Sequence, residues 1–218
     1  YLYGTHILER AKQQGVRVVN NPQAIRDCNE KLFATEFSAL MPTTWVSSRH
    51  EDIRAFQQSH GDIILKPLDG MGGSGIFRIT ADGLNLGAVL ETLSPDESRL
   101  VMAQEYRPEI ADGDRRVLVL HGQPISHVLA RIPSQGETRG NLAAGGRGVA
   151  MPISDREREI AETVGPYLLE RGLLFVGLDV IGGHLTEINV TSPTCVREID
   201  AHANTQLGHD FFEALFNQ

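Results

Sequence analysis

A glycine-rich segment in the first third of the chain is the first candidate for chemistry. Gly70–Gly75 matches the pattern G-x-G-x-x-G. A dinucleotide fingerprint needs a helix after the glycines, but Ile76–Thr80 alternates in polarity and predicts a strand. We therefore expect a strand–loop–strand unit whose backbone N–H groups can lie over phosphates, because glycine allows close approach. A mobile hairpin tip is the alternative interpretation.

A lysine stands just before this loop. Lys66 follows the apolar run of residues 63–65. An unpaired charge in such a strand is unfavourable, and a phosphate held by the glycine loop would supply the partner. The alternative is an edge-strand lysine whose ammonium group reaches solvent. The neighbouring glycine loop favours the phosphate.

Two carboxylates and an amide form a third candidate group. Asp179, Glu187 and Asn189 lie on two predicted strands joined near a glycine pair. If the turn has three residues, Gly182–His184, Asp179 faces Glu187 and Asn189 shares their face. Facing carboxylates repel unless a cation lies between them, and an all-oxygen set suits Mg²⁺. A two-residue turn would pair Asp179 with Thr186 and break the site. Polar residues on a solvated sheet face are the other alternative.

Residues 131–150 form a fourth candidate, because they predict a long glycine-rich loop. Long loops inside compact domains are usually functional lids or disordered. Arg131, Arg139 and Arg147 could each hold a carboxylate or phosphate through paired hydrogen bonds. We interpret the segment as a lid that closes over an anionic substrate. A solvated flexible loop is the alternative.

The composition excludes several classes of protein. A chain of 218 residues fits one large domain or two small ones of roughly 100–200 residues. Its net charge of −8 argues against a nucleic-acid partner, and no apolar run reaches the length of a membrane span. Cys28 and Cys195 are too few for a disulfide framework and fit a reducing cytosol. We expect Cys195 to be an inert cysteine.

The helices and strands that position these groups can be predicted from the spacing of apolar residues and from the glycine and proline residues that end each element. We expect a capping box at Ser154 and Glu157. Helices are predicted over 1–14, 22–40, 50–60, 85–93, 154–171 and 205–216. Strands are predicted over 16–20, 43–47, 62–67, 76–80, 100–104, 115–121, 124–132, 173–181 and 185–190. The mixture of hairpins and isolated helices indicates an α+β fold.

These residues together resemble the ATP-grasp region of the bacterial glutathione synthetase family over essentially the whole chain. The lid and the segment Thr186–Thr194 are specific to this family, whereas the lysines and the metal-ligand pattern are shared across the ATP-grasp superfamily. The segments that carry the resemblance are Asp27–Leu32, Ile64–Gly73, Asp112–Val119, Arg131–Pro133, Gly136–Gly148, Phe175–Asp179 and Thr186–Thr194.

The resemblance implies an α+β ATP-grasp fold in which two α+β lobes enclose ATP. It implies a remnant of a preceding α/β domain over 1–20, a small lobe over 21–103, and a large lobe over 104–218 with the metal site and the lid 131–150. Because family members carry a whole N-terminal domain before this region, and because the chain begins at Tyr1 in the middle of a helical pattern, we expect it to be a piece of a longer protein.

The resemblance also implies roles for individual residues. Asp179, Glu187 and Asn189 would hold Mg²⁺ or Mn²⁺, and Arg116, Arg131 and Lys66 would be catalytic. The residues implied for ATP binding are Lys31, Lys66, Gly70, Met71, Gly72, Gly73, Ser74, Gln104, Glu105, Tyr106 and Asp114. Those implied for substrate binding are Arg116, Arg131, Arg139, Gly146, Arg147, Ser192 and Thr194.

The activity implied by the resemblance is the ATP-dependent ligation of glycine to γ-glutamylcysteine through an acyl phosphate. The partners would be those two substrates and ATP, with no nucleic acid or membrane, in a cytoplasmic homo-oligomer. Two alternatives stay open. One is another ATP-grasp carboxylate–amine ligase, such as one of the ribosomal-protein-modifying type. The other is a nucleotide-binding module without catalysis, because a shortened chain can be inactive.

Overall fold

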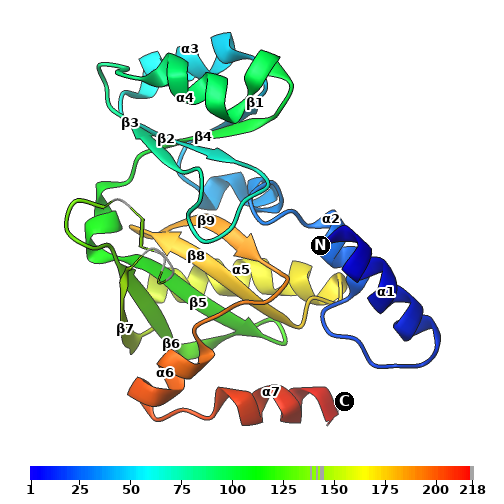
Figure 1. Cartoon of the computed structure of the whole chain (residues 1–218). Coiled ribbons are helices and arrows are strands. Elements are labelled where there is room, and N and C mark those ends of the chain that lie inside the picture. Colours follow the sequence, from blue (N-terminus) through cyan, green and yellow to red (C-terminus); the bar gives the residue numbers. More distant parts are fainter. Residues whose placement is uncertain (138, 141, 143–144, 217–218) are drawn as a thin grey trace.

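Two antiparallel sheets organise the computed structural model, which describes residues 1–137, 139–140, 142 and 145–216 (Figure 1). The small sheet has the order β1-β4-β2-β3 and the large sheet the order β7-β6-β5-β8-β9. The small sheet consists of β1 (Thr44–Ser47), β2 (Ile63–Pro67), β3 (Phe77–Ile79) and β4 (Val101–Glu105). The large sheet consists of β5 (Asp114–Leu120), β6 (Gln123–Ile132), β7 (Arg147–Pro152), β8 (Phe175–Ile181) and β9 (His184–Asn189). The predicted α+β class is confirmed.

Two helices cover one face of the small sheet, α3 (His50–His60) and α4 (Leu86–Leu93), at the top of Figure 1. Ile53 and Leu90 from these helices belong to one buried apolar cluster with Ile63 and Leu65 of β2. Because strand side chains alternate between faces, Lys66 points away from the helices. The lysine therefore faces the large sheet.

One helix, α5 (Asp155–Glu170), covers one face of the large sheet. Its buried residues Ile160 and Leu168 belong to the same apolar cluster as Val117 of β5 and Leu178 of β8. On the other face, α6 (Val196–Ala203) brings Ile199 into a second cluster with Leu118 and Leu129. Only part of this second face is covered by α6, and the part nearer the small sheet carries charged side chains.

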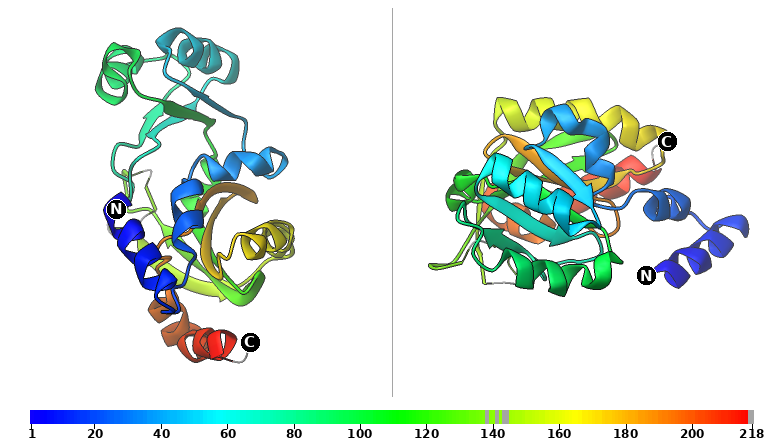
Figure 2. Two further views of the ribbon diagram at one scale, coloured as in Figure 1. Left: turned by 90° about the vertical axis from the view of Figure 1, so that its right-hand side faces the viewer. Right: turned by 90° about the horizontal axis from the view of Figure 1, so that it is seen from above.

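The remaining helices lie around the large sheet. They are α1 (Leu2–Gln13), α2 (Pro22–Asp27) and α7 (Leu207–Phe216), with the 3₁₀ segments η1 (Phe33–Leu40), η2 (Pro95–Glu97) and η3 (Pro108–Asp112). Figure 2 shows α1 projecting from the side of the molecule, while η1 lies between the small sheet and α5. None of the helices in the described ranges combines the length and the apolar character needed to cross a membrane.

The prediction of one helix over 22–40 is wrong. The helix α2 ends at Asp27, and η1 starts at Phe33. Between them the Asn29 side chain accepts hydrogen bonds from the backbone N–H groups of Lys31 and Leu32, at 3.1 and 3.0 Å. Asparagine side chains that bond to the following backbone favour turns over helices. The break places Lys31 in a turn, from which it reaches the small sheet.

The predicted strand over 16–20 is also wrong, because these residues pair with neither sheet. Instead the Asn20 side chain donates to the carbonyl groups of Phe175 and Val190, both at 2.7 Å, and accepts from the Phe175 N–H at 2.9 Å. A buried asparagine thus joins the start of β8 to the end of β9.

Two further differences lie near the site. The predicted loop over 131–150 is wrong at its end, because Arg147–Pro152 form β7, with Arg147 opposite Ile132. The sequence did not predict the helix α6, which is preceded by Cys195 in a left-handed conformation with a φ of 89°. The part of the predicted lid at 138, 141 and 143–144 lies outside the described residues.

The capping box of α5 is confirmed, and it gives a stability prediction. Ser154 Oγ accepts from Glu157 N at 3.3 Å, and Ser154 N donates to Glu157 Oε2 at 2.8 Å. We expect Ser154→Ala to lower the free energy of unfolding by about 1 kcal/mol, because the backbone N–H of Glu157 loses its acceptor. Urea denaturation would measure it. The matched control is Ser59→Ala in α3, where the exposed hydroxyl bonds to Ala55 O within the helix and alanine is the better helix former. Equal losses in both variants would contradict the capping role.

Candidate active site

The polar part of the large sheet is built around an ion pair between neighbouring strands. Arg116 of β5 lies directly opposite Asp179 of β8 in the strand register. Its Nε donates to Asp179 Oδ1 at 2.6 Å and its Nη2 to Oδ2 at 3.2 Å. Both residues are buried. Such a two-point contact fixes the orientation of the guanidinium as well as its charge.

A second arginine extends this pair. Arg131 lies near the end of β6, and its Nη2 is 2.9 Å from Asp179 Oδ1 and 2.6 Å from Asp114 Oδ2. The register places Asp114 directly opposite Arg131. We call Arg116, Asp179, Arg131 and Asp114 the charge ladder. The ladder spans three adjacent strands, so the antiparallel register of β6, β5 and β8 is what brings its members together.

The two carboxyl groups of the ladder titrate differently. Burial opposes ionisation of Asp179, but Arg116 and Arg131 outweigh it and lower its pKa to about 2. Burial raises the pKa of Asp114 to about 6 against the opposing effect of Arg131. Asp114 bonds to one arginine, Arg131, which also contacts Asp179. The buried Oδ1 atom of Asp114 has no hydrogen-bond partner within the described structure. Asp179 is therefore the firmly ionised member.

Two buried lysines, Lys31 and Lys66, face the ladder from the other side, and we call them the lysine cluster. Lys66 Nζ lies 3.8 Å and Lys31 Nζ 3.7 Å from Glu187 Oε1. Lys66 also donates to Gln104 Oε1 at 3.1 Å, and Lys31 donates to Gly70 O at 3.0 Å. Burial lowers the pKa of Lys66 against the opposing effect of Glu187. A further anion beside these lysines would relieve the cost of their desolvation.

The predicted pairing of Asp179 with Glu187 is confirmed, although the predicted turn is wrong. Ile181 pairs with His184, so the turn has two residues, Gly182 and Gly183. A β-bulge between Asp179 and Val180 shifts the register by one and restores the pairing of Asp179 with Glu187. The Thr186 hydroxyl, beside the bulge, donates to Asp179 O at 3.1 Å. Bulges near functional sites commonly re-aim side chains in this way.

Asn189 lies on the same strand but is used differently. It is opposite Gly177, and its side-chain N–H donates to Gly177 O at 3.2 Å. Within the described residues, no three His, Cys, Asp or Glu side chains form a group that could hold a metal. The predicted ligands are two carboxylates and an amide, and this oxygen set fits Mg²⁺ or Mn²⁺ by chemistry. They lie beside buried cations that fit phosphate.

Gln104, Glu105 and Tyr106, which the resemblance implies for ATP binding, lie at the end of β4 and directly after it. Gln104 Nε2 donates to Thr44 Oγ1 at 2.9 Å, and Thr43 Oγ1 donates to Glu105 Oε2 at 3.3 Å. The ring of Tyr106 is covered by the guanidinium of Arg78, whose Cζ lies 3.9 Å from the ring centroid. Gln104 therefore touches the lysine cluster, while Tyr106 already has a cationic partner.

The glycine loop and the lid meet in the structure. Arg139 Nη1 donates to Gly73 O at 3.4 Å. A side chain at Gly140 would overlap the backbone oxygen of Arg131, so the lid backbone lies against the ladder there. Met71 at the tip of the glycine loop is 82% exposed. The described lid residues thus contact both halves of the site.

Four predicted substrate residues lie farther from these contacts. Ser192 and Thr194 are exposed on the segment between β9 and α6, where Thr194 Oγ1 is 3.7 Å from Cys195 Sγ. Gly146 and Arg147 lie at the start of β7. Within the described part of the chain, no hydrogen bond or ion pair joins these four to the ladder or to the lysines, so their roles stay predictions.

Two residues of the site were missed by sequence reasoning. Asn29 donates from its side chain to Leu68 O at 3.2 Å, which ties the turn before Lys31 to the glycine loop. Glu30 accepts at its backbone oxygen from Ile188 N at 2.9 Å, and burial together with nearby Glu187 raises the pKa of its carboxyl group. Their place beside Lys31 in the sequence was the available signal.

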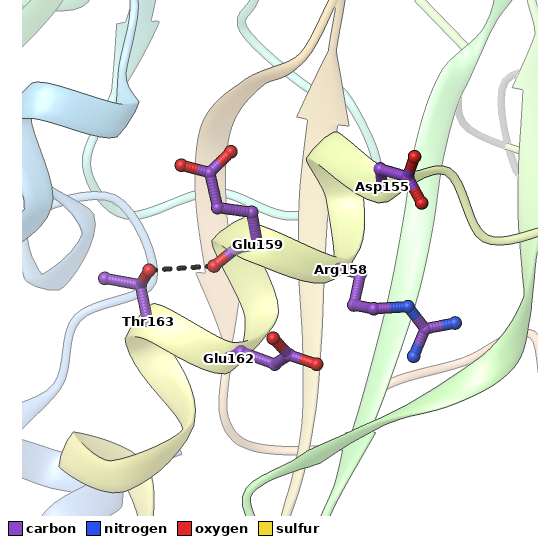
Figure 3. A pocket seen from close by; sticks show the side chains of 5 residues that line it. All are labelled: Asp155, Arg158, Glu159, Glu162 and Thr163. Carbon is purple, nitrogen blue, oxygen red and sulfur yellow. Dashed lines mark hydrogen bonds between the residues drawn. The ribbon is translucent and has the colours of Figure 1, made fainter.

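A surface hollow on α5 lies apart from this site. Figure 3 shows Asp155, Arg158, Glu159, Glu162 and Thr163 lining it on α5, with Thr163 Oγ1 donating to Glu159 O at 2.8 Å. The helix α5 covers the sheet face opposite to the ladder. We interpret the hollow as a solvated helix face, because its charged groups belong to one helix.

We expect the free energy of unfolding to depend on pH through the two carboxyl groups of the charge ladder, those of Asp114 and Asp179. The pKa of Asp114 is raised in the folded protein from its ordinary 3.8 to about 6. The folded state therefore binds this proton more tightly, and the stabilisation it gives is complete below about pH 4 and lost as pH rises through 6. Asp179 has the opposite sign, and its stabilisation is lost as pH falls from about 4 toward 2.

We expect Asp114→Asn to remove the decline in stability between about pH 4 and pH 6. Urea denaturation at a series of pH values would measure it, with Asp112→Asn, an exposed neighbour in η3, as the control. Parallel curves for the wild type and Asp114→Asn would contradict the raised pKa.

Solved structures with the same fold are known. The ATP-grasp ligase PsnB complexed with minimal precursor superposes with a TM-score of 0.69 at 25% identity, over 99% of this chain and 68% of that one. The D-cycloserine synthetase DcsG superposes with a TM-score of 0.72 at 15% identity, over 98% and 77%. These neighbours confirm the predicted ATP-grasp fold.

Curated relatives are much closer in sequence. Glutathione synthetase of Pseudomonas aeruginosa is 59% identical over 218 residues, which are all of this chain and 69% of that protein. Glutathione synthetase of Yersinia pestis is 61% identical over 201 residues, 92% of this chain and 63% of that protein.

Two family models divide the chain between them. Residues 1–26 match the prokaryotic glutathione synthetase N-terminal domain, and residues 30–204 match the prokaryotic glutathione synthetase ATP-grasp domain. The second match includes the charge ladder, both buried lysines and Glu187. The chain therefore belongs to the prokaryotic glutathione synthetase family of ATP-grasp ligases.

Proposed function

We propose that this protein joins glycine to γ-glutamylcysteine at the expense of ATP, giving glutathione, ADP and phosphate. One observation carries the proposal beyond family membership. The side chains of Lys31, Lys66, Arg116 and Arg131 converge with at most 6% exposure. Their acidic neighbours in the structure are the buried Asp114 and Asp179 and the partly exposed Glu30 and Glu187, so four buried cations face two buried carboxylates. A buried excess of positive charge suits phosphates and carboxylates.

The binding of ATP would use the small sheet and the residues that follow it. Lys31 and Lys66 would contact the phosphates, under the loop of Gly70, Met71, Gly72, Gly73 and Ser74. Gln104, Glu105 and Tyr106 would contact the adenine, with Asp114 close to the nucleotide. Support comes from the bonds that Lys31 and Lys66 make to Gly70 O and Gln104 Oε1, because they place both ammonium groups between these two regions.

The chemistry would take place beside the ladder. The cysteinyl carboxylate oxygen of γ-glutamylcysteine attacks the γ-phosphorus of ATP, and ADP leaves. The glycine amine then attacks the carbonyl carbon of the acyl phosphate, its nitrogen loses a proton, and inorganic phosphate leaves with the bridging oxygen. Arg116 and Arg131 would hold the carboxylate and then the acyl phosphate. Stabilisation by such fixed cations lowers the barrier, because charge builds up on the transferred phosphoryl oxygens.

A divalent cation would be held by Asp179, Glu187 and Asn189. When bound, Mg²⁺ or Mn²⁺ would neutralise phosphate charge between the nucleotide and the ladder. The chemistry of the three oxygen donors supports this proposal. In the structure, Asp179 is paired with two arginines and Glu187 faces two lysines.

The lid would shield the acyl phosphate from water. The contacts of Arg139 with Gly73 O and of Gly140 with Arg131 support a lid over 131–150, with Arg139, Gly146, Arg147, Ser192 and Thr194 on the substrate side. We further propose a remnant of the preceding domain over 1–20, a small lobe over 21–103 and a large lobe over 104–218. We also propose a cytoplasmic homo-oligomer, with no nucleic-acid or membrane partner. The free thiols of Cys28 and Cys195 fit the reducing compartment.

The test is ADP release by the purified protein with ATP, Mg²⁺ and γ-glutamylcysteine, with and without glycine. We expect glycine-dependent release that falls by at least about a hundredfold in Lys66→Ala and in Glu187→Gln, because each removes a charge proposed to face the phosphates or the cation. Lys12→Ala, an exposed lysine on α1, serves as the control and should retain the wild-type rate.

The acceptor distinguishes the alternatives. Release that depends on glutamate instead of glycine would indicate another ATP-grasp carboxylate–amine ligase, a class that shares this fold. ATP binding without release in the presence of any of these amines would indicate a nucleotide-binding module. Either result would overturn the proposed reaction. The measurement of ATP binding would still test whether the lysine cluster binds the nucleotide.

A further inference from the structure

One glycine of β8 lies directly beneath two parts of the proposed substrate site. Gly177 precedes Asp179 by two residues, so both face the polar side of the large sheet. A Cβ atom at Gly177 would lie 2.9 Å from Arg116 Cδ and 3.0 Å from Arg116 Nη1. It would also lie 2.9 Å from Pro193 Cβ. Protein interiors are close-packed and leave no room for an added methyl group at such distances.

The backbone at Gly177 does not itself require glycine. Its φ lies outside the left-handed region that favours this residue type. It pairs in regular register with Leu118 on one side and Asn189 on the other. Because glycine weakens a strand interior, alanine would suit the backbone better. The contacts with Arg116 and Pro193 are therefore the feature that an added side chain would disturb.

We propose that Gly177 is a positioning residue for the γ-glutamylcysteine site. The bare Cα lets the aliphatic stem of Arg116 lie flat on β8, which is how its guanidinium reaches Asp179 at 2.6 Å. It also lets Pro193 pack against the same spot, which places the neighbouring Ser192 and Thr194. This inference rests on the proposed function, because that proposal assigns Arg116 and the 192–194 segment to the substrate.

An added methyl group would act on one substrate and not the other. It would displace Arg116 and Pro193 together, because both lie within 3 Å of the same point. The lysine contacts proposed for ATP come from other segments, since Lys66 lies on β2 and bonds to Gln104 on β4. The lysine cluster would therefore keep its geometry. The expected signature is a change in the KM for γ-glutamylcysteine without a change in the KM for ATP.

The first measurement is the steady-state kinetics of Gly177→Ala. We expect the KM for γ-glutamylcysteine to rise on the order of tenfold to a hundredfold, the loss typical of a misplaced binding group. The KM for ATP should stay within about twofold of the wild-type value, which is below the change that a lost hydrogen bond produces. An unchanged KM for γ-glutamylcysteine would overturn the proposal.

The matched control is Gly165→Ala in α5. This glycine lies on the opposite side of the same sheet, and a Cβ there would overlap the backbone oxygen of Gly122. Its φ is also outside the left-handed region. The substitution is thus the same and the steric conflict is the more severe of the two, but the conflict is remote from Arg116. We expect a lower melting temperature with both KM values unchanged. A rise in the KM for γ-glutamylcysteine in the control as well would attribute the effect to general destabilisation and overturn the proposal.

A second measurement does not depend on activity. The Nε–H group of Arg116 is buried and bonded to Asp179, so it should give a slowly exchanging ¹H–¹⁵N signal, assigned by its absence in Arg116→Lys. We expect this signal to shift or exchange rapidly in Gly177→Ala and to stay in place in Gly165→Ala. An unchanged signal in Gly177→Ala would overturn the proposal. If the wild type releases no ADP, the proposed function fails, but the signal still decides whether Gly177 positions Arg116.

Discussion

The contact between Arg116 and Asp179 is the interaction on which the rest of the site depends. Both groups are withdrawn from water, and each would be strongly unfavourable there alone. The pair exists only because β5 and β8 hold the two residues opposite each other. The Oδ1 atom of Asp179, which already accepts from Arg116, also contacts Arg131. Asp114 in turn depends on Arg131. The order of the strands in the large sheet therefore sets the order of charges along the ladder.

Local irregularities of the backbone serve this arrangement. The bulge beside Thr186 keeps Glu187 opposite Asp179 and aims it at the lysines. The turn at Asn29 interrupts a helix and delivers Lys31 to the glycine loop. At Gly140 and Gly177 the absence of a side chain allows Arg131 and Arg116 to be approached closely. Regular helices and strands hold the site in place, whereas these local irregularities bring its charged side chains within contact distance of one another.

The sequence predicted what depends on local pattern. The capping box at Ser154, most strands and the facing of Asp179 and Glu187 followed from spacing, although the last was correct because a bulge compensated for the shorter turn. The arginine-bearing lid supplied Arg131 and the family resemblance supplied Arg116, but their partners could not be predicted. Arg116 is 63 residues from Asp179 along the chain, and no periodicity links positions so far apart. The turn at Asn29 and the helix α6 depended on single side-chain bonds and one left-handed residue, which propensities do not resolve.

The chain crosses between the two sheets twice, and the two connecting segments run side by side. Thr44 pairs with Gln104, and Glu105 N donates to Thr43 O at 2.9 Å, so the chain enters and leaves the segment from 44 to 105, here called the flap, through one pair of hydrogen-bonded strands, here called the strap. Once the bonds of Leu68, Gly70 and Gly73 to the rest of the site are released, a flap connected in this way could rotate about the strap. In such a rotation the tip of the glycine loop at Met71 would travel far, while Gln104 and Glu105 would scarcely move. A ligand gripped at the strap would remain seated while the flap opens and closes over its other end.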